Sequence, residues 1–131
     1  MKKYLVGLLM CLASYSYADP LSPEKAFHFI GKVENSSVMI YLTTQPGYRL
    51  YKDSIKVINN KSQVKLESII KPQGKRIYNE FLNKYQQEYI GDVLMEIPFT
   101  GKGNIEFDIE SQGCTEGLCY SPFTTNIKLK K

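Results

Sequence analysis

Two cysteines near the C-terminal end of the chain are the residues best suited to covalent chemistry. Cys114 and Cys119 are separated by four residues, and Gly113 and Gly117 beside them permit a tight turn. Two sulfurs held this close can form a disulfide. If one sulfur is exposed as a thiolate, the pair can also exchange with another protein's disulfide, and the second cysteine then resolves the mixed disulfide.

The spacing alone leaves two roles open for this pair. A ring this small removes little entropy from the unfolded chain, so it stabilises less than the roughly 3 kcal/mol estimated for a fifteen-residue loop. This weakens the case for a purely structural bridge. Exported proteins commonly carry structural disulfides, however, so both a redox pair and a structural bridge remain hypotheses at this point.

The N-terminus has the features of a cleaved export signal. A basic start over 1–3 precedes an apolar segment over 4–12 that is too short to span a bilayer, and Ser16–Ala18 is a small-x-small cleavage site. We therefore predict a signal peptide over 1–18, a single domain over 19–131, and export to the periplasm. No later apolar run reaches the length of a membrane span, so we expect no stable membrane insertion after cleavage.

Composition excludes several other functions. Loss of Lys2 and Lys3 with the signal lowers the count of basic residues from 17 to 15, against 13 acidic ones, and no basic stripe suggests nucleic acid. His28 is the only histidine, which argues against a histidine metal site or a Ser-His-Asp triad. We expect no cofactor and no metal, and we expect His28 to be packed within its apolar segment.

The elements that must position the cysteines follow a β pattern. Short segments alternate apolar and polar residues or are rich in β-branched and aromatic residues, whereas helical periodicity is almost absent. The expected strands cover 26–30, 38–43, 48–52, 54–58, 64–67, 89–99, 104–110 and 123–129. We expect Pro98 to end the strand over 89–99 and a polar connection over 72–87. Six to nine short strands predict an all-β fold, an immunoglobulin-like antiparallel β-sandwich.

The cysteine segment also resembles a known family. Residues 112–122, Gln-Gly-Cys-Thr-Glu-Gly-Leu-Cys-Tyr-Ser-Pro, are similar to the active-site segment of the N-terminal periplasmic domain of DsbD, a bacterial thiol:disulfide interchange protein. That family has a Gly-Cys, a short insert containing glycine, and a Cys-Tyr-Pro-Pro. Upstream, 47–52 resembles the family's aromatic strand, and 72–74 with 79–82 resembles the stretch that leads into its cap loop. The matches span nearly all of the predicted mature chain.

The resemblance implies an immunoglobulin-like sandwich with a specific division of labour between the cysteines. Cys119 would exchange with partner proteins, and Cys114 would resolve the mixed disulfide. Tyr51 would belong to the aromatic wall around them.

The resemblance also implies a protective cap. Phe81 would shield the disulfide, with Asn79 and Glu80 beside the sulfurs. An aromatic cap denies access to stray thiols until a docking partner displaces it. A carboxylate such as Glu80 near a sulfur disfavours the thiolate.

The sequence departs from the family pattern in several places. The insert between the cysteines is one residue shorter, Ser121 replaces the first proline, and Asn79 stands where an acid is common. We also expect the chain to lack the membrane-embedded and thioredoxin-like parts of full DsbD. We therefore expect a monomer with protein-disulfide reductase activity that receives electrons in trans, from a membrane donor or a thioredoxin-like periplasmic protein. Its expected recipients are disulfide isomerases or cytochrome c maturation. The alternative is a non-catalytic exported β-sandwich, a binding or assembly module with a structural hairpin disulfide.

Overall fold

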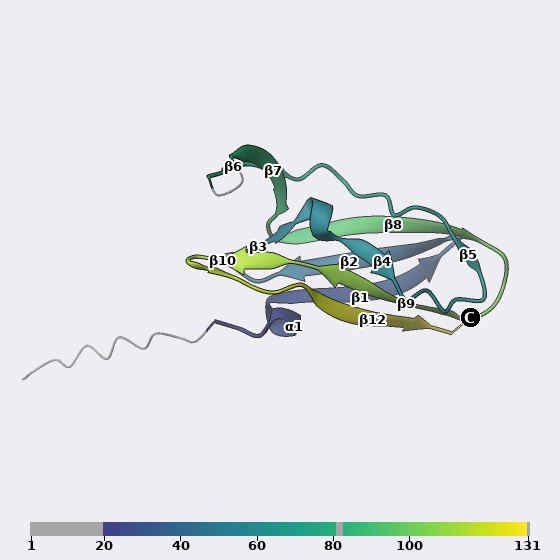
Figure 1. Ribbon diagram of the computed structural model, residues 1–131. Coiled ribbons are helices and arrows are strands. Elements are labelled where there is room, and N and C mark those ends of the chain that lie inside the picture. Colours follow the sequence, from purple (N-terminus) through teal and green to yellow (C-terminus); the bar gives the residue numbers. More distant parts are fainter. Residues whose placement is uncertain (1–19, 81–82, 131) are drawn as a thin grey trace, which may run out of the picture.

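The computed structural model describes residues 20–80 and 83–130, so the predicted signal peptide lies outside the described residues. Within them the chain forms twelve strands, one short α-helix and one 3-10 turn (Figure 1). The elements are α1 Pro23–Ala26, β1 Phe27–Glu34, β2 Ser37–Thr44, β3 Tyr48–Tyr51, η1 Lys52–Ser54, β4 Lys56–Ile58, β5 Lys65–Leu66, β6 Lys75–Asn79, β7 Lys84–Tyr89, β8 Asp92–Thr100, β9 Ile105–Ser111, β10 Gly113–Thr115, β11 Leu118–Cys119 and β12 Phe123–Leu129. In this part of the chain no helix is long and apolar enough to cross a membrane.

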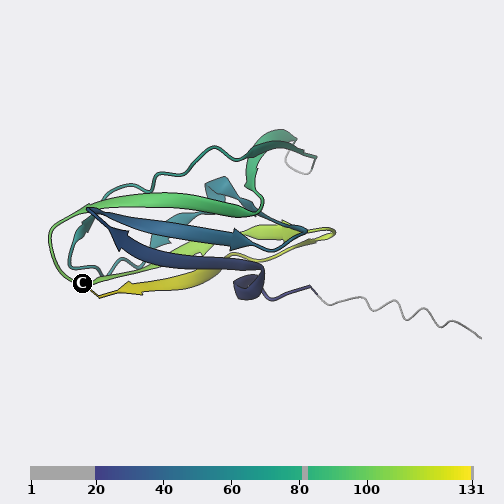
Figure 2. The ribbon, with the colours of Figure 1, turned by 180° about the vertical axis from the view of Figure 1, so that it is seen from behind.

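The strands pair in antiparallel sheets that enclose one core. One sheet has the order β1-β2-β8-β5, a second has β12-β9-β4, and a third has β11-β10-β3-β7-β6. Ile40 and Ile97 from the first sheet and Phe107 and Ile109 from the second are fully buried in the same apolar cluster. The predicted immunoglobulin-like antiparallel β-sandwich is confirmed (Figures 1 and 2).

Alternation along the chain explains why several strands were predictable. In β9, Ile105, Phe107 and Ile109 are buried, whereas the acidic residues between them are only half-buried. One face of this strand therefore packs on the core while the other meets solvent, which is the arrangement that alternating apolar and charged residues predict. The predicted strand over 123–129 coincides with β12.

The predicted polar connection over 72–87 is wrong, because this region forms the hairpin β6–β7. Its residues up to Gln87 are exposed or half-buried and mostly polar, so no alternation of apolar and polar residues marks it as a strand. Cross-strand aromatic contacts stabilise it instead: the rings of Tyr78 and Tyr85 lie 5.1 Å apart, and the guanidinium of Arg76 lies 4.1 Å from the centre of the Tyr85 ring. Tyr89 ends β7, and a turn at Gly91, with φ of +77°, separates it from β8.

The expectation that Pro98 ends its strand is wrong. Pro98 lies within β8, opposite Ser37 of β2. Its carbonyl accepts a hydrogen bond from the backbone N–H of Glu67, 2.8 Å away. In an antiparallel strand the N–H and C=O of one residue point to the same side, so the hydrogen that proline lacks would have faced Glu67, just beyond the short strand β5. The missing bond therefore leaves the ladder between β2 and β8 intact.

Two smaller expectations also need correction. His28 is exposed rather than packed, because Phe27 and Phe29 on either side point into the core and a strand alternates its faces. The strands expected over 48–52 and 54–58 are shorter, because Lys52–Ser54 forms a single 3-10 turn between them.

Candidate active site

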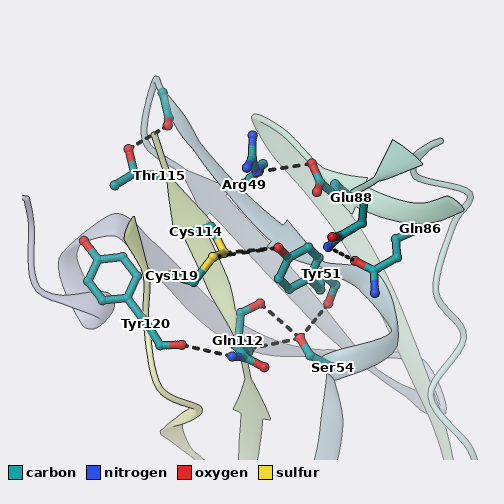
Figure 3. The surroundings of a disulfide bond; sticks show 12 residues. Arg49, Tyr51, Ser54, Gln86, Glu88, Gln112, Cys114, Thr115, Cys119 and Tyr120 are labelled. Atoms are coloured by element: carbon teal, nitrogen blue, oxygen red, sulfur yellow. Dashed lines mark hydrogen bonds and ion pairs between the residues drawn. A yellow bond between two sulfur atoms is a disulfide. The ribbon is translucent and has the colours of Figure 1, made fainter. Parts of the chain in front are cut away.

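The two cysteines lie directly opposite each other in the hairpin β10–β11 and form a disulfide, with their Cα atoms 4.1 Å apart (Figure 3). The next residue pair is joined by a hydrogen bond from the N–H of Tyr120 to the carbonyl of Gly113. Hydrogen-bonded and non-hydrogen-bonded pairs alternate along an antiparallel ladder, so the cysteines occupy a non-hydrogen-bonded position, where opposing side chains lie closest. The turn between the strands includes Gly117, whose φ of +74° favours glycine.

Solvent reaches the two cysteines very differently. Cys114 is 0% exposed, whereas Cys119, on the outermost strand of its sheet, is exposed. A thiolate arriving from solvent therefore has access to Cys119 but not to Cys114.

Close packing beneath the hairpin explains the burial of Cys114. A Cβ added to Gly113 would lie 2.3 Å from Cζ of Phe27 and 2.8 Å from the carbonyl oxygen of Arg49, so only glycine fits here. The ring of Phe27 stacks on Phe123 at 5.8 Å and meets Tyr48 edge-on at 5.9 Å. The base of the hairpin thus rests on an aromatic cluster that joins β1, β3 and β12.

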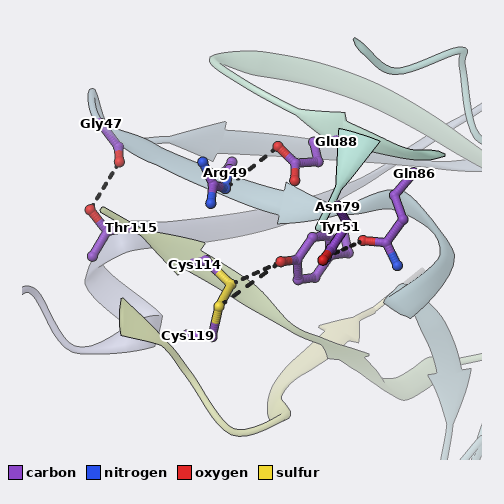
Figure 4. Close-up of polar contacts among 9 residues, drawn as sticks. All are labelled: Gly47, Arg49, Tyr51, Asn79, Gln86, Glu88, Cys114, Thr115 and Cys119. Carbon is purple, nitrogen blue, oxygen red and sulfur yellow. Dashed lines mark hydrogen bonds and ion pairs between the residues drawn. A yellow bond between two sulfur atoms is a disulfide. The ribbon is translucent and has the colours of Figure 1, made fainter. Parts of the chain in front are cut away.

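Polar contacts fix the hairpin at both ends. Near its tip, the hydroxyl of Thr115 donates to the carbonyl of Gly47, 2.9 Å away (Figure 4). At its base, the side-chain amide of Gln112 donates to the carbonyl of Tyr120 at 3.1 Å, and the N–H of Gln112 donates to the hydroxyl of Ser54 at 2.9 Å (Figure 3). These bonds hold the disulfide at a fixed position on the sheet.

Tyr51 contacts both sulfurs. Its hydroxyl lies 3.2 Å from Sγ of Cys114 and 3.9 Å from Sγ of Cys119 (Figures 3 and 4). Neither sulfur of a disulfide carries a hydrogen, so the hydroxyl of Tyr51 is the donor. Tyr51, predicted as part of the aromatic wall, therefore also makes hydrogen bonds to the sulfurs.

A cleft of about 410 Å³ adjoins Cys119. Its lining residues are Tyr51, Asp53, Ser54, Asn79, Gln86, Gln112 and Cys119. Three of them carry carboxamide groups, and the amide of Asn79 donates to the side-chain oxygen of Gln86, 3.2 Å away. Carboxamides both donate and accept hydrogen bonds, as a peptide backbone does, so the cleft is suited to polar, peptide-like groups next to the exposed cysteine.

The structure brings together four of the six residues predicted for the site. Cys114, Cys119 and Tyr51 are in contact, and Asn79 lines the same cleft as Cys119. Glu80 is exposed in the turn after β6 and is not among the residues that line the cleft.

The sixth predicted residue, Phe81, lies outside the described residues.

Sequence reasoning missed an ion pair beside the disulfide. Arg49 lies opposite Cys114 in the pairing of β3 with β10, and its Nε is 3.5 Å from Oε2 of Glu88 on β7 (Figures 3 and 4). Glu88 is only 3% exposed, and this burial raises the pKa of its carboxyl group, although the positive charges of Arg49 and Lys75 act in the opposite direction. The sequence feature that could have indicated Arg49 is its position two residues before Tyr51, because this spacing places both side chains on one face of a strand.

Comparisons with known proteins agree with this geometry. The family model for the N-terminal part of thiol:disulfide interchange protein DsbD matches residues 17–131. Among curated relatives, DsbD of Pasteurella multocida is 28% identical over 117 residues, which cover 83% of this chain and 19% of the relative. DsbD of Actinobacillus pleuropneumoniae is 27% identical over 134 residues, which cover 95% of this chain and 22% of the relative. The chain thus spans about a fifth of the length of these relatives.

Two solved structures from Neisseria meningitidis have the same fold. The reduced DsbD N-terminal domain matches with a TM-score of 0.74 and 25% identity, covering 86% of this chain and 91% of that domain. A chain in the structure of the complex between the DsbD and PilB N-terminal domains matches with a TM-score of 0.70 and 25% identity. The match covers 84% of this protein and 87% of that chain. Because the family model matches residues 17–131, which include all of the described residues, this protein belongs to the family of DsbD N-terminal domains.

Proposed function

We propose that the chain is a periplasmic thiol:disulfide interchange domain that relays electrons through Cys114 and Cys119 to other thiol proteins. The observation that carries this proposal is the asymmetric disulfide, in which one cysteine is exposed and its partner is fully buried. An exchange centre needs one accessible sulfur and one protected sulfur that can resolve the mixed disulfide.

The exchange can be written with its electrons balanced. A thiolate of the electron donor attacks Sγ of Cys119, a new disulfide forms between the two proteins, and Cys114 leaves as a thiolate. A second thiolate of the donor then attacks the sulfur of the donor's first cysteine in the mixed disulfide, and Cys119 leaves as a thiolate. The donor becomes a disulfide, and this domain gains two electrons. In the reverse sense, Cys119 attacks an acceptor disulfide and Cys114 resolves the intermediate.

The surroundings of the sulfurs support this scheme. The hydroxyl of Tyr51 donates to Sγ of Cys114 and can stabilise the charge that develops there when it leaves. The cleft beside Cys119 provides polar groups, including Asn79, for the segment that carries the partner's cysteine. The sequence resemblance adds a capping role for Phe81, a residue outside the described ones.

Compartment and partners are inferred from the sequence and from the relatives. Residues 1–18 are the signal peptide, 19–131 are the exported domain, and the periplasm is the site of action. The complex between the DsbD and PilB N-terminal domains of N. meningitidis supports a partner that is itself a domain of another protein. A thioredoxin-like protein or a membrane donor supplies electrons in trans, and disulfide isomerases or the cytochrome c maturation pathway receive them.

Mixed-disulfide trapping tests the proposal. The PilB N-terminal domain of N. meningitidis serves as the probe, in its oxidised form. It is mixed with the reduced Cys114→Ala or Cys119→Ala chain, each of which also carries Cys11→Ser. Cys114→Ala retains the exposed sulfur and lacks the resolving one, so it should accumulate a covalent complex on a non-reducing gel. Cys119→Ala should form none. Equal trapping by both variants would contradict the assigned roles, and no trapping by either would contradict exchange with this class of domain.

A further inference from the structure

Four functional side chains share one face of the sheet β11-β10-β3-β7-β6. Arg49 pairs with Cys114 across β3 and β10, and Glu88 pairs with Tyr51 across β3 and β7. Directly opposed residues point to the same face, and so do residues two apart in one strand. Cys114, Arg49, Tyr51 and Glu88 therefore form a continuous row of neighbours on that face (Figure 4).

The ion pair within this row is incomplete. Glu88 is 3% exposed and Arg49 is 43% exposed in their side chains, and Nε of Arg49 lies 3.5 Å from Oε2 of Glu88. Neither of these two atoms has a hydrogen-bond partner among the described residues. Arg49 thus compensates the charge of Glu88 without a saturated, bidentate pairing, and its guanidinium keeps donors for another anion.

Exchange at Cys119 creates such an anion next to Arg49. When the disulfide breaks, the electron pair of the S–S bond stays on Sγ of Cys114, a residue that solvent does not reach. A thiolate shielded from water needs a nearby positive charge or hydrogen-bond donors. Tyr51 supplies one donor, at 3.2 Å, and the cation at the opposing position of β3 is Arg49.

We propose that Arg49 is a positioning residue for exchange, whose guanidinium compensates the negative charge of the Cys114 thiolate, and that Glu88 both anchors Arg49 and limits this compensation. The inference rests on the proposed function only in taking Cys119 as the attacked sulfur. The step needs no additional reactant: a partner thiolate forms a bond to Sγ of Cys119, the bond between Cys119 and Cys114 breaks, and its electron pair leaves with Cys114.

Other ionisable groups on the neighbouring elements define the electrostatic setting. Lys75 of β6 lies opposite Glu88, and its charge, like that of Arg49, lowers the pKa of the Glu88 carboxyl that burial raises. Asp53 of η1 lines the adjoining cleft with Tyr51. Among these groups, Arg49 is the one paired in register with Cys114, so its removal should affect that sulfur most.

The test measures the protonation of Cys114 directly. In a chain carrying Cys11→Ser and Cys119→Ser, Cys114 is the single cysteine, and its ¹³Cβ shift reports the thiolate fraction as pH is raised. Arg49→Gln should lower the thiolate fraction at a fixed pH about tenfold, which corresponds to one pKa unit. Arg49→Lys keeps the charge and should change the fraction less than about threefold, whereas Glu88→Gln should raise it.

Matched controls remove the same charges elsewhere. Arg76→Gln removes a guanidinium stacked on Tyr85, and Glu67→Gln removes an exposed carboxylate beside β5; both should leave the thiolate fraction of Cys114 nearly unchanged. The opposite signs expected for Arg49→Gln and Glu88→Gln separate an electrostatic role from a structural one, because a disrupted sheet would shift Cys114 in the same direction in both variants. Circular dichroism confirms that each variant is folded.

Three outcomes would overturn the proposal: an Arg49→Gln titration equal to that of Arg76→Gln, an Arg49→Lys titration equal to that of Arg49→Gln, or a shift in the same direction for Arg49→Gln and Glu88→Gln. The measurement needs no partner protein. A failure of the mixed-disulfide trapping therefore leaves this result standing, and a failure here leaves the interchange function standing.

Discussion

The hydroxyl of Tyr51 donates a hydrogen bond to Sγ of Cys114, 3.2 Å away, in a residue that has no exposed surface. The two residues lie on neighbouring strands, β3 and β10, so the sheet itself fixes this contact. In the disulfide the bond joins two neutral groups. When Cys114 becomes a thiolate the same bond is charge-assisted, and such bonds are roughly twice as strong.

Replacing Tyr51 with phenylalanine should therefore slow exchange without unfolding the domain. A hydrogen bond to a charged group contributes about 1.5–3 kcal/mol, so we expect the reduction of the disulfide by dithiothreitol to slow about tenfold or more. Stopped-flow kinetics measure this rate. Tyr41→Phe is the matched control, because that hydroxyl contacts Glu34 on the other sheet. Equal rates for the two variants would show that the Tyr51 hydroxyl does not assist the leaving sulfur.

Gly113→Ala should destabilise the domain through a steric clash. The added Cβ would lie 2.3 Å from Cζ of Phe27 and 2.8 Å from the carbonyl oxygen of Arg49, and overpacking of this kind costs about 1–3 kcal/mol. Urea denaturation measures the free energy of unfolding.

Phe27→Leu in the same chain should recover part of this loss relative to Phe27→Leu alone, because the aromatic carbons that clash are removed. An unchanged stability in Gly113→Ala would contradict the close packing described beneath the cysteines.

The Glu88→Gln substitution should increase the stability of the fold, relative to the original chain, as pH rises. Burial raises the pKa of this carboxyl in the folded state, so the folded protein holds the proton more tightly than the unfolded chain does. The stabilisation associated with the protonated form is complete below the unfolded value of about 4.3 and is lost as pH rises through the raised folded value. Glutamine has no proton to lose.

We therefore expect the stability of Glu88→Gln relative to the original chain to increase between pH 4 and pH 8, measured by urea denaturation at each pH. Glu67→Gln, at an exposed position, should show no such trend. A relative stability that falls over this range would mean that the pairing with Arg49 outweighs burial of the carboxylate.

Much of the fold was predictable because burial leaves a pattern in the sequence. The strand β9 has one face in the core and one in solvent, so its residues alternate, and β12 was predicted with its observed bounds. The hairpin β6–β7 has no such pattern: its stability depends on the pairing of Tyr78 with Tyr85, which becomes visible only when the register is known. Pro98 misled because its missing hydrogen bond falls beyond the end of β5.

The candidate site was predictable only where chemistry is local. Cys114 and Cys119 are close in sequence, so their pairing could be anticipated. The contact of Tyr51 with a sulfur spans 63 positions, and the pairing of Arg49 with Glu88 joins two strands whose alignment no local pattern specifies. The resemblance to a family provided Tyr51, but an ion pair particular to these residues required the sheet register.

The reduction potential of the Cys114–Cys119 couple shows whether this disulfide is an exchange centre or a structural bridge. The oxidised chain is equilibrated in defined thiol buffers, and the fraction of disulfide is measured together with the circular dichroism spectrum. Structural bridges in secreted proteins typically lie below about −300 mV, whereas labile and catalytic pairs lie higher. We expect a value above that limit and a domain that stays folded when reduced. A value below it, with unfolding on reduction, would contradict an exchange centre and favour a structural hairpin disulfide in a binding module.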